Sequence, residues 1–461
     1  MKQPQYTTLF VLLMLLTSCG EDRSGEFYAL IEDRMWIEQT MREHYLWYEE
    51  IPEIEEKDYF QEPATFFKSL LYKQALDGKG DKYSYLEEAP KATTEEEGRS
   101  LTLDRESTYG MEFELSSDPT RTTNHTFAHI LYVLPDSPAD KAGIKRGDWI
   151  SAFNKKRVNS SNYQELKKGG SIALAREHIV MTENGIGWQS GDTLNLEPSV
   201  KMEINPFLVC NTIGIDGKKV AYLVYNEFST GPNDKSDETE YIEQMISLFK
   251  EIKKEAPDEF ILDLRYNNGG YLQCAQTLAS LLAPAHALGN TFTSLTFNDK
   301  SDPQTSKYIF DPKLADANLD LDKIYILTGS HTASASEAVI NGLIPYMGAE
   351  NVILVGTKTE GKNVAMVSYK NEAYGLTLYP IVAYVSNAEN KGDYINGFQP
   401  HYELDERSIT PWYPLGDPKE YLLGNTLSLI FTGSTMDTPR TRTRATNVER
   451  SSIESRGLII N

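Results

Sequence analysis

The chain of 461 residues contains few cysteines, little positive charge and no long apolar run. Its three cysteines, Cys19, Cys210 and Cys274, do not form the dense pattern of a disulfide scaffold, and we expect the last two to be buried. Lys and Arg number 45 against 67 Asp and Glu, and this net charge of −22 argues against a nucleic-acid partner. The sequence also lacks a His-Glu-x-x-His zinc motif and a Gly-x-Ser-x-Gly elbow, and it implies no metal or organic cofactor.

The first residues combine a positive charge, Lys2, with an apolar run from Leu9 to Leu16. This run is too short to span a bilayer and is typical of a secretory signal peptide. It ends in LTSCG at residues 16–20, which resembles a lipobox and implies cleavage before Cys19 and lipid attachment to its sulfur. We therefore expect a lipid-anchored protein of the bacterial cell envelope, on the periplasmic side or the cell surface. An ordinary signal peptide with an incidental cysteine is the alternative.

Composition and periodicity change along the rest of the chain. In residues 27–86 apolar side chains such as Ile37, Met41 and Tyr45 recur at helical spacing, whereas residues 87–104 are mostly polar and read as a linker. From about Val220 onward, short apolar strands alternate with helices, which implies a partly parallel sheet. The predicted strands are 221–225, 260–264, 324–327 and 352–355, and the predicted helices are 272–282 and 334–347.

The segment from 105 to 200 resembles a PDZ domain. The string SPADKAGIKRGDWI at residues 137–150 has the order of that family: a short helix, a glycine turn and a strand that opens with Gly-Asp. The resemblance implies capture of an extended peptide by strand addition, with its terminal carboxylate held in a backbone nest. The peptide-binding residues would be Tyr109, Gly110, Met111 and Phe113. Glu112 is unusual there, because its charge would repel a bound carboxylate unless it points away.

Three segments in the second half of the chain carry the polar residues that indicate catalysis. They are DLRYNNGG at 263–270, TASASE at 332–337 and GTKTEGK at 356–362. Together and in this order they resemble the C-terminal processing (tail-specific) serine peptidases. The resemblance implies that Ser334 is the nucleophile and Lys362 the general base. It also implies that the oxyanion donors are the backbone N–H groups of Ala335 and of Gly269 or Gly270.

The chemistry of a Ser–Lys pair fits these positions. A serine hydroxyl needs a base within hydrogen-bond reach, and a lysine becomes such a base when burial lowers its pKa. Ser334 stands at the N-terminus of a predicted helix, whose free N–H groups and dipole favour a developing oxyanion. Taken singly, Ser334 could be a helix N-cap, Lys362 a surface lysine and the glycine pair an ordinary turn. The interpretation depends on all three segments occurring together, downstream of the PDZ signature.

Two departures concern the general base. Many members of the family have a Gln four residues after the Lys, but this chain has Met366, which cannot orient an amine as a hydrogen-bond acceptor. Glu360 would raise the pKa of Lys362 and oppose its role as a base. Glu337, three residues after the nucleophile, is the candidate for a third catalytic residue.

The resulting prediction is a multidomain α+β protein with a small helical N-terminal domain, a PDZ-like β-rich domain and an α/β protease core with a mixed, partly parallel sheet. We predict a serine endopeptidase that cleaves exported, unstructured polypeptides and captures their C-terminal tails. The alternative is a catalytically weak or inactive peptide-binding lipoprotein on the same scaffold. The predicted segments are a signal peptide (1–18), a lipidated tether (19–26), the helical domain (27–86), a linker (87–104), the PDZ-like domain (105–200), the Ser–Lys peptidase core (201–432) and a flexible tail (433–461).

Overall fold

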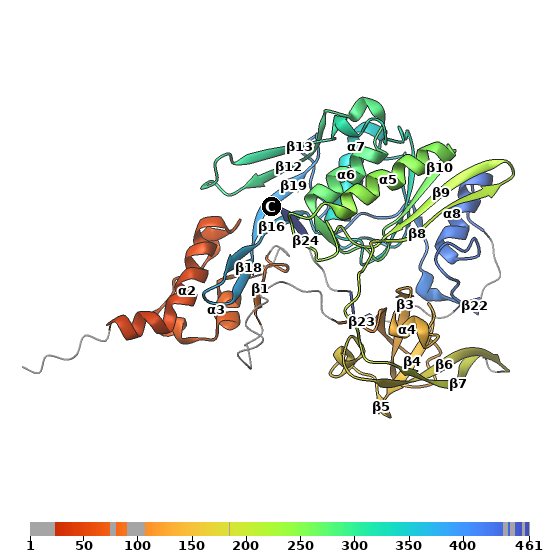
Figure 1. Cartoon of the computed structure of the whole chain (residues 1–461), viewed down its shortest axis with the longest axis horizontal. Coiled ribbons are helices and arrows are strands. Elements are labelled where there is room, and N and C mark those ends of the chain that lie inside the picture. Colours follow the sequence, from red (N-terminus) through yellow and green to blue (C-terminus); the bar gives the residue numbers. More distant parts are fainter. Residues whose placement is uncertain are drawn as a thin grey trace, which may run out of the picture.

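The computed structural model describes residues 24–73, 80–89, 107–183, 185–436, 441–442, 448–453 and 457–460. Figure 1 shows a helical N-terminal part, a β-rich part and a larger α/β core, which confirms the predicted mixed α+β fold. The predicted signal peptide and Cys19 lie outside the described residues.

The PDZ-like domain is built on an antiparallel sheet in which β2, β3, β4, β6 and β7 are successive neighbours. A four-residue helix, capped by the Ser137 hydroxyl, follows β3 as the sequence pattern predicts. The side chains of Phe113, Ile130 and Ile150 lie in one hydrophobic cluster that is separate from the main core. The elements are β2 (Met111–Ser117), β3 (Thr126–Val133), α4 (Pro138–Lys141), β4 (Trp149–Phe153), β5 (Lys156–Arg157), β6 (Ile172–Thr182) and β7 (Gly185–Leu196).

The first sheet of the protease core has the order β20-β15-β14-β10-β9-β8, and all its pairs are parallel except β8 with β9. The four strands predicted from apolar runs all lie in this sheet. The elements of this sheet and its helices are β8 (Phe207–Ile215), β9 (Lys218–Tyr225), α5 (Glu240–Glu255), β10 (Glu259–Asp263), α6 (Leu272–Leu282), β14 (Ile324–Thr328), α7 (Ala335–Met347), β15 (Val352–Gly356), β20 (Tyr402–Glu403) and α8 (Tyr421–Thr432).

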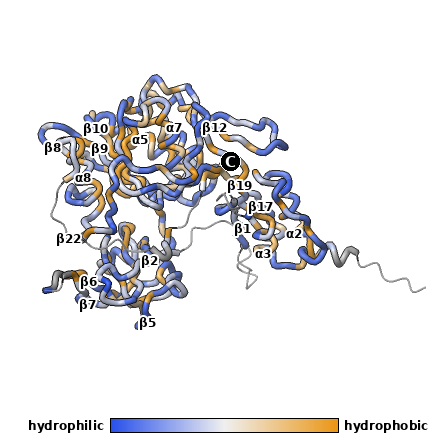
Figure 2. The backbone as a smooth tube through the Cα atoms, turned by 180° about the vertical axis from the view of Figure 1, so that it is seen from behind, coloured by the Kyte–Doolittle hydropathy of each residue, from blue (hydrophilic) through white to orange (hydrophobic). Residues whose placement is uncertain are grey.

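Both faces of this sheet are covered by helices. In β9 the side chains of Ala221 and Leu223 enter the cluster that contains residues of α5, α6 and α7, whereas those of Val220 and Tyr222 enter the cluster that contains residues of α8. This alternation follows from the two-residue period of a strand. Figure 2 shows the hydrophobic segments gathered within the core around α5 and α7. A strand buried on both faces reads as a continuous apolar run, which explains why the sequence located these strands.

A second sheet lies across α7 and has the order β11-β24-β16-β19-β12-β13. It matters for function because β11 contains the glycine pair and β16 begins two residues after Lys362. Its elements, with the short strands that follow, are β11 (Gly269–Tyr271), β12 (Thr291–Phe297), β13 (Thr305–Ile309), β16 (Val364–Val367), β17 (Tyr369–Asn371), β18 (Leu376–Tyr379), β19 (Ile381–Ser386) and β21 (Ile409–Thr410).

The N-terminal part shares its hydrophobic core with the protease core. It contains α2 (Ser24–His44), α3 (Pro63–Leu70) and β1 (Tyr85–Glu88), and β1 pairs antiparallel with β18. Ile37, Met41 and Phe66 are buried in the same cluster as residues of α6 and α7. The N-terminal part therefore packs against the protease core as an additional layer. Its segment before β1, which contains Tyr83, lies close to Lys362.

The C-terminal residues differ from the prediction. We expected a flexible tail from 433 onward, yet β22 (Thr441–Arg442), β23 (Val448–Ser451) and β24 (Gly457–Ile460) are strands paired with earlier parts of the chain. The prediction was wrong for these residues because polar composition does not reveal that β21, the edge of β2 and the slot between β11 and β16 are available to pair with them. The expectation for Cys210 was also wrong: Cys274 is buried, but Cys210 is exposed because it lies on β8, at the edge of its sheet.

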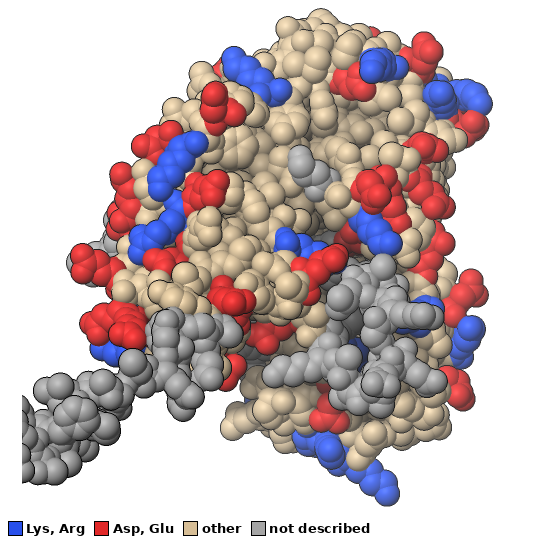
Figure 3. Space-filling view, turned by 60° about the vertical axis from the view of Figure 1, so that its left-hand side comes forward, with Lys and Arg blue, Asp and Glu red and all other residues tan. Residues whose placement is uncertain are grey.

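The surface reflects the acidic composition. Asp and Glu side chains are spread over the margins of the face in Figure 3, with Lys and Arg between them. Within the described ranges, no helix is long and apolar enough to cross a membrane.

Candidate active site

Ser334 stands immediately before α7, on a loop that is held by hydrogen bonds to the segment after β10. Ala333 N–H and the Ser336 hydroxyl both donate to the Asn267 carbonyl, at 3.1 and 3.0 Å. Thr332 Oγ1 donates to the Leu264 carbonyl at 2.8 Å. Ser334 itself has a φ of 59° and a ψ of −107°, a backbone conformation that is strained for a residue with a side chain. Such strain at a helix N-terminus is a feature of functional sites.

The side chain of Ser334 is buried, with 1% of its surface exposed. Among the described residues, its hydroxyl oxygen has no hydrogen-bond partner. Buried polar atoms in folded proteins almost always have a partner, so an unpartnered hydroxyl at this position needs a functional explanation.

Lys362 is also 1% exposed, and burial lowers its pKa to about 7. The carboxylates of Asp81, Glu360 and Glu337 oppose this shift, in that order. Its Nζ lies 4.5 Å from the centre of the Tyr83 ring, a contact that also favours the ammonium form. Desolvation outweighs these effects, so a large fraction of the amine is neutral near pH 7.

Glu337 joins the serine loop to the lysine loop. Its Oε2 accepts from the backbone N–H groups of Ser334 and Lys362, at 2.9 and 2.8 Å. Its Oε1 accepts from Thr359 Oγ1 at 2.6 Å and from Gly361 N–H at 2.7 Å. Four donors thus converge on one buried carboxylate. Because two of these donors are the backbone N–H groups of Ser334 and Lys362, the carboxylate holds the two candidate catalytic residues in place relative to each other. These contacts identify Glu337 as a positioning residue rather than as a group that orients the lysine amine.

The two glycines after Asn267 border the nucleophile. Gly269 and Gly270 have φ values of 109° and 135°, and a Cβ on Gly269 would lie 2.9 Å from Ser334 Cβ. The N–H of Gly269 donates to Asn267 Oδ1 at 3.0 Å. Gly269 O and Tyr271 N bond to Phe228 on one edge of β11, so the polar groups of Gly270 face the opposite edge, where β24 lies. Of the two glycines, Gly270 is therefore the better candidate for an oxyanion donor.

The predicted peptide-binding residues lie at the start of β2. Gly110 adopts a φ of 79°, and its carbonyl accepts from Leu134 N–H at 2.8 Å, whereas Met111 and Phe113 belong to the strand. The edge of β2 that faces away from β3 is occupied by β23, which pairs antiparallel with β2. Glu112 does not point away from this edge, because its carboxylate accepts a hydrogen bond from the Ser452 hydroxyl.

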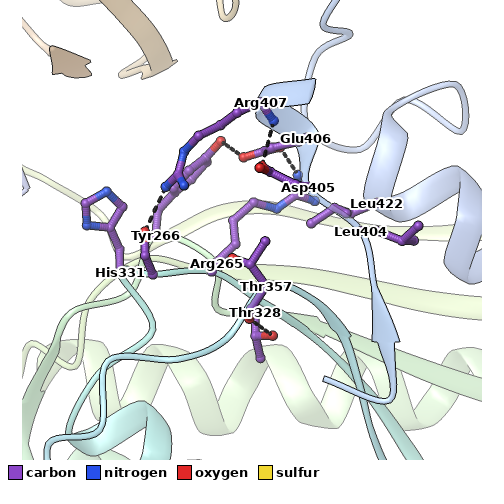
Figure 4. Close-up of a pocket in the computed structure, with 12 residues that line it drawn as sticks. Arg265, Tyr266, Thr328, His331, Thr357, Leu404, Asp405, Glu406, Arg407 and Leu422 are labelled. Carbon is purple, nitrogen blue, oxygen red and sulfur yellow. Dashed lines mark hydrogen bonds and ion pairs between the residues drawn. The ribbon is translucent and has the colours of Figure 1, made fainter. Parts of the chain in front are cut away.

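Buried ion pairs connect the PDZ-like domain to the loop that carries the glycine pair. Arg265, which is 2% exposed, bonds to Asp263 at 2.8 Å, to Glu406 at 2.6 Å and to Glu420 at 2.8 Å. Arg146, from the PDZ-like domain, bonds to Glu406 at 2.6 Å. These guanidinium groups hold the pKa of Glu420 down, to about 2, against the effect of burial. Figure 4 shows Arg265, Tyr266, Glu406 and Arg407 around one pocket.

A second connection runs from β2 to the serine loop. Glu114 is buried, and its carboxylate contacts His331 Nε2 at 2.7 Å and Arg407 at 2.9 Å. His331 lies three residues before Ser334. The PDZ-like domain is thus bonded to two loops of the candidate site, the one that carries Ser334 and the one that carries the glycine pair.

Sequence reasoning placed Ser334, Lys362, Ala335 and the two glycines, and the structure brings all of these residues together. It missed Tyr83, Asp81 and Arg265, because their contacts with the site are made only in the folded chain. The Asp263–Arg265 spacing at the end of a buried strand was the one available signal. Across the described ranges, no group of three or more His, Cys, Asp or Glu side chains is placed to hold a metal ion.

Comparisons with known proteins agree with this architecture. The family model of peptidase family S41 matches residues 219–404, that of the peptidase S41 N-terminal domain matches 34–85, and that of the PDZ domain matches 129–168. A crystal structure of a "Putative S41 protease" from Bacteroides fragilis shares 33% sequence identity and a TM-score of 0.72, and the match covers 86% of this chain and 96% of that one.

Two curated relatives are similar over part of their length. The carboxyl-terminal-processing protease of a Picosynechococcus species is 28% identical over 51% of this chain, and the carboxy-terminal processing protease CtpA of Bacillus subtilis is 26% identical over 64%. The matched regions span 50% and 58% of these two relatives.

Proposed function

The chain belongs to peptidase family S41, and from this premise we propose that it is a serine endopeptidase with Ser334 as nucleophile and Lys362 as general base. The observation that carries the proposal is the burial of Lys362, whose side chain is 1% exposed beside the loop of Ser334. Burial brings its pKa to about 7, so the amine can accept a proton at neutral pH. The hydroxyl of Ser334 is buried without a hydrogen-bond partner among the described residues, so the reaction requires it to form its hydrogen bond to Lys362 Nζ when a substrate binds.

The proposed reaction follows the usual course of acyl transfer. The neutral Lys362 amine takes the proton from Ser334 Oγ while that oxygen attacks the carbonyl carbon of the substrate peptide bond. The oxyanion is stabilised by the N–H groups of Gly270 and Ala335, and the lysine then gives its proton to the leaving amine. A water molecule, deprotonated by the same lysine, hydrolyses the ester on Ser334 and regenerates the free hydroxyl. Glu337 contributes by holding both loops in place.

The proposed substrates are extended, unstructured polypeptides. The site lies beside strand edges, and a peptide that joins such an edge must be free of its own secondary structure. Capture of C-terminal tails by the PDZ-like domain, through the loop from Tyr109 to Phe113, belongs to the proposal. So does attachment to the cell envelope through a lipid on Cys19, which would keep the enzyme near exported chains.

Cleavage of an unfolded protein by the parent and by Ser334→Ala tests the assignment. The parent should cleave a reduced and alkylated protein, Ser334→Ala should not, and Ser160→Ala, a change in an exposed turn, should behave like the parent. Since β24 lies in the site, a variant whose last strand is displaced, Leu458→Asp, belongs in the same assay. Inertness of both the parent and Leu458→Asp would refute the proposal, and retained peptide binding would then support a binding protein.

A further inference from the structure

The last described strand of the chain, β24, lies inside the candidate active site. It runs parallel to β11 on one side and parallel to β16 on the other. Gly457 is opposite Gly269, and Leu458 is opposite both Gly270 and Ala365. Figure 1 shows the C-terminus beside β16 and β24, at the centre of the molecule rather than at its periphery.

Gly457 lies against the residues proposed to perform the chemistry. Its carbonyl oxygen is 3.0 Å from the place where a Cβ on Gly269 would lie, next to Ser334 Cβ. A Cβ on Gly457 itself would lie 2.5 Å from Lys362 Nζ and 2.8 Å from Met366 Cε. In a parallel pairing of Gly270 with Leu458, the carbonyl of the preceding residue, Gly457, faces the Gly270 N–H. The Gly457 carbonyl thus stands where the carbonyl of a substrate would stand.

The residues after Gly457 are apolar and buried. Leu458, Ile459 and Ile460 are 1%, 6% and 6% exposed, and all three belong to the main hydrophobic cluster. Burial of aliphatic side chains is the dominant favourable term in such an association. The slot therefore favours a peptide that has glycine at the position facing Lys362 and aliphatic residues after it.

The same tail also occupies the open edge of the PDZ-like domain. β23 pairs antiparallel with β2, so that Ser451 is opposite Glu114. The following residue, Ser452, exchanges backbone and side-chain hydrogen bonds with Phe113, with Phe113 N–H to Ser452 Oγ at 2.8 Å and Ser452 N–H to the Phe113 carbonyl at 2.9 Å. Strand addition at this edge is how a PDZ domain holds an extended peptide. One tail thus fills both places where a substrate chain would bind.

We propose that the C-terminal segment of this chain is a cis-acting peptide ligand of its own substrate cleft. Residues 457–460 add as a strand between β11 and β16, cover Ser334 and Lys362, and must leave before another polypeptide enters. The competing ligand is an extended peptide with glycine followed by aliphatic residues. This inference rests on the proposed function only in taking the slot between β11 and β16 as the substrate cleft.

The test displaces the tail in the full-length chain and follows two independent signals. Leu458→Asp places a charge in the apolar slot, whereas Ser434→Asp adds the same charge at an exposed position and is the matched control. A tethered segment acts at an effective concentration on the order of millimolar, so its removal should raise cleavage of an unfolded protein at least about tenfold. Gly457→Val, in which the new Cβ meets Lys362, should act in the same direction.

Binding is measured separately from cleavage, in the Ser334→Ala background. The probe is a fluorescent peptide with the sequence of residues 448–461, VERSSIESRGLIIN. It should bind Ser334→Ala/Leu458→Asp at least about tenfold more tightly than Ser334→Ala alone, whose slot is already filled. The same peptide with valine in place of Gly457 should bind at least about tenfold more weakly. Circular dichroism of each variant identifies any that has failed to fold.

The outcomes separate the two claims. Tighter peptide binding after Leu458→Asp, without cleavage by any Ser334-containing chain, supports the tail as ligand and refutes the peptidase. Equal cleavage by the parent, Leu458→Asp and Ser434→Asp, together with equal peptide binding in the Ser334→Ala background, overturns the inference and leaves the peptidase intact. If Leu458→Asp does not fold, Gly457→Val gives the same reading.

Discussion

The pH dependence of cleavage should follow the titration of Lys362. The neutral amine is the proposed base, and its pKa is lowered by burial to about 7. At pH 6 roughly a tenth of the lysine is neutral and at pH 8 roughly nine tenths, so the maximal rate should rise about tenfold between these values. The sign follows from the role: a group that must lose its proton before it acts gives a rate that increases with pH. An unshifted lysine would leave the rate rising up to about pH 10.

Occupancy of the cleft contributes to this shift. Gly457 lies against Lys362 Nζ, so β24 takes part in desolvating the amine, and a substrate strand in the same slot would do likewise. The midpoint near 7 should therefore appear in kcat, which reports the occupied enzyme. In Leu458→Asp the free cleft admits water, and the midpoint of kcat/KM should lie above that of kcat.

Glu360→Gln provides a perturbation of known direction. The Glu360 carboxylate raises the pKa of Lys362, and its side chain is exposed, with Tyr83 OH 3.4 Å from its Oε1. Its neutralisation should move the midpoint of kcat to lower pH and raise the rate at pH 6. Glu372→Gln, a change of an exposed carboxylate paired with Lys370, is the control and should leave the midpoint in place. The midpoint is obtained from initial rates on a fluorogenic peptide between about pH 5.5 and 9.5, for the parent, Glu360→Gln and Glu372→Gln. A midpoint that does not move, or moves upward, in Glu360→Gln refutes the reasoning.

Two further predictions concern the buried carboxylates and their partners. Glu337→Gln replaces an acceptor of four hydrogen bonds by a group that accepts at one end only, so it should lower the free energy of unfolding by about 1–3 kcal/mol. It should also lower kcat more than it raises KM, whereas the exposed Glu389→Gln should do neither. Arg265→Met leaves Asp263 buried without its cation and Glu420 with Arg146 alone, at 3.3 Å, and it should cost about 3–5 kcal/mol in urea unfolding at pH 7. This loss should shrink as pH falls, because Glu420, held at a pKa of about 2 in the parent, can then bind a proton in the variant; a loss that does not depend on pH would contradict this account.

Much of the fold could be predicted because short apolar runs in the sequence indicate the buried strands. The runs at 260–264 and 324–327 form strands buried on both faces, which need apolar residues at nearly every position and so stand out in the sequence; Asp263, paired with Arg265, is the exception.

The role of Glu337 illustrates what the sequence could not supply. Its position after Ser334 marked it as a candidate catalytic group, but its partners are backbone N–H groups on two separate loops. Backbone donors leave no trace in a sequence, since every residue but proline carries one. The same holds for Tyr83, whose ring reaches Lys362 from a distant part of the chain.

By itself, the sequence determined the strands of the first core sheet that are buried on both faces, the helices that follow them, and the short segments that carry Ser334, Lys362 and the glycine pair, because periodicity and glycine requirements are local properties of the chain. Tertiary structure alone decided the electrostatic state of Lys362, since burial against Tyr83, Gly457 and the Glu337 loops is a sum over distant segments. It also decided the place of the last residues. Residues 457–460 are a short apolar run, and only the slot between β11 and β16 makes them a strand in the candidate active site.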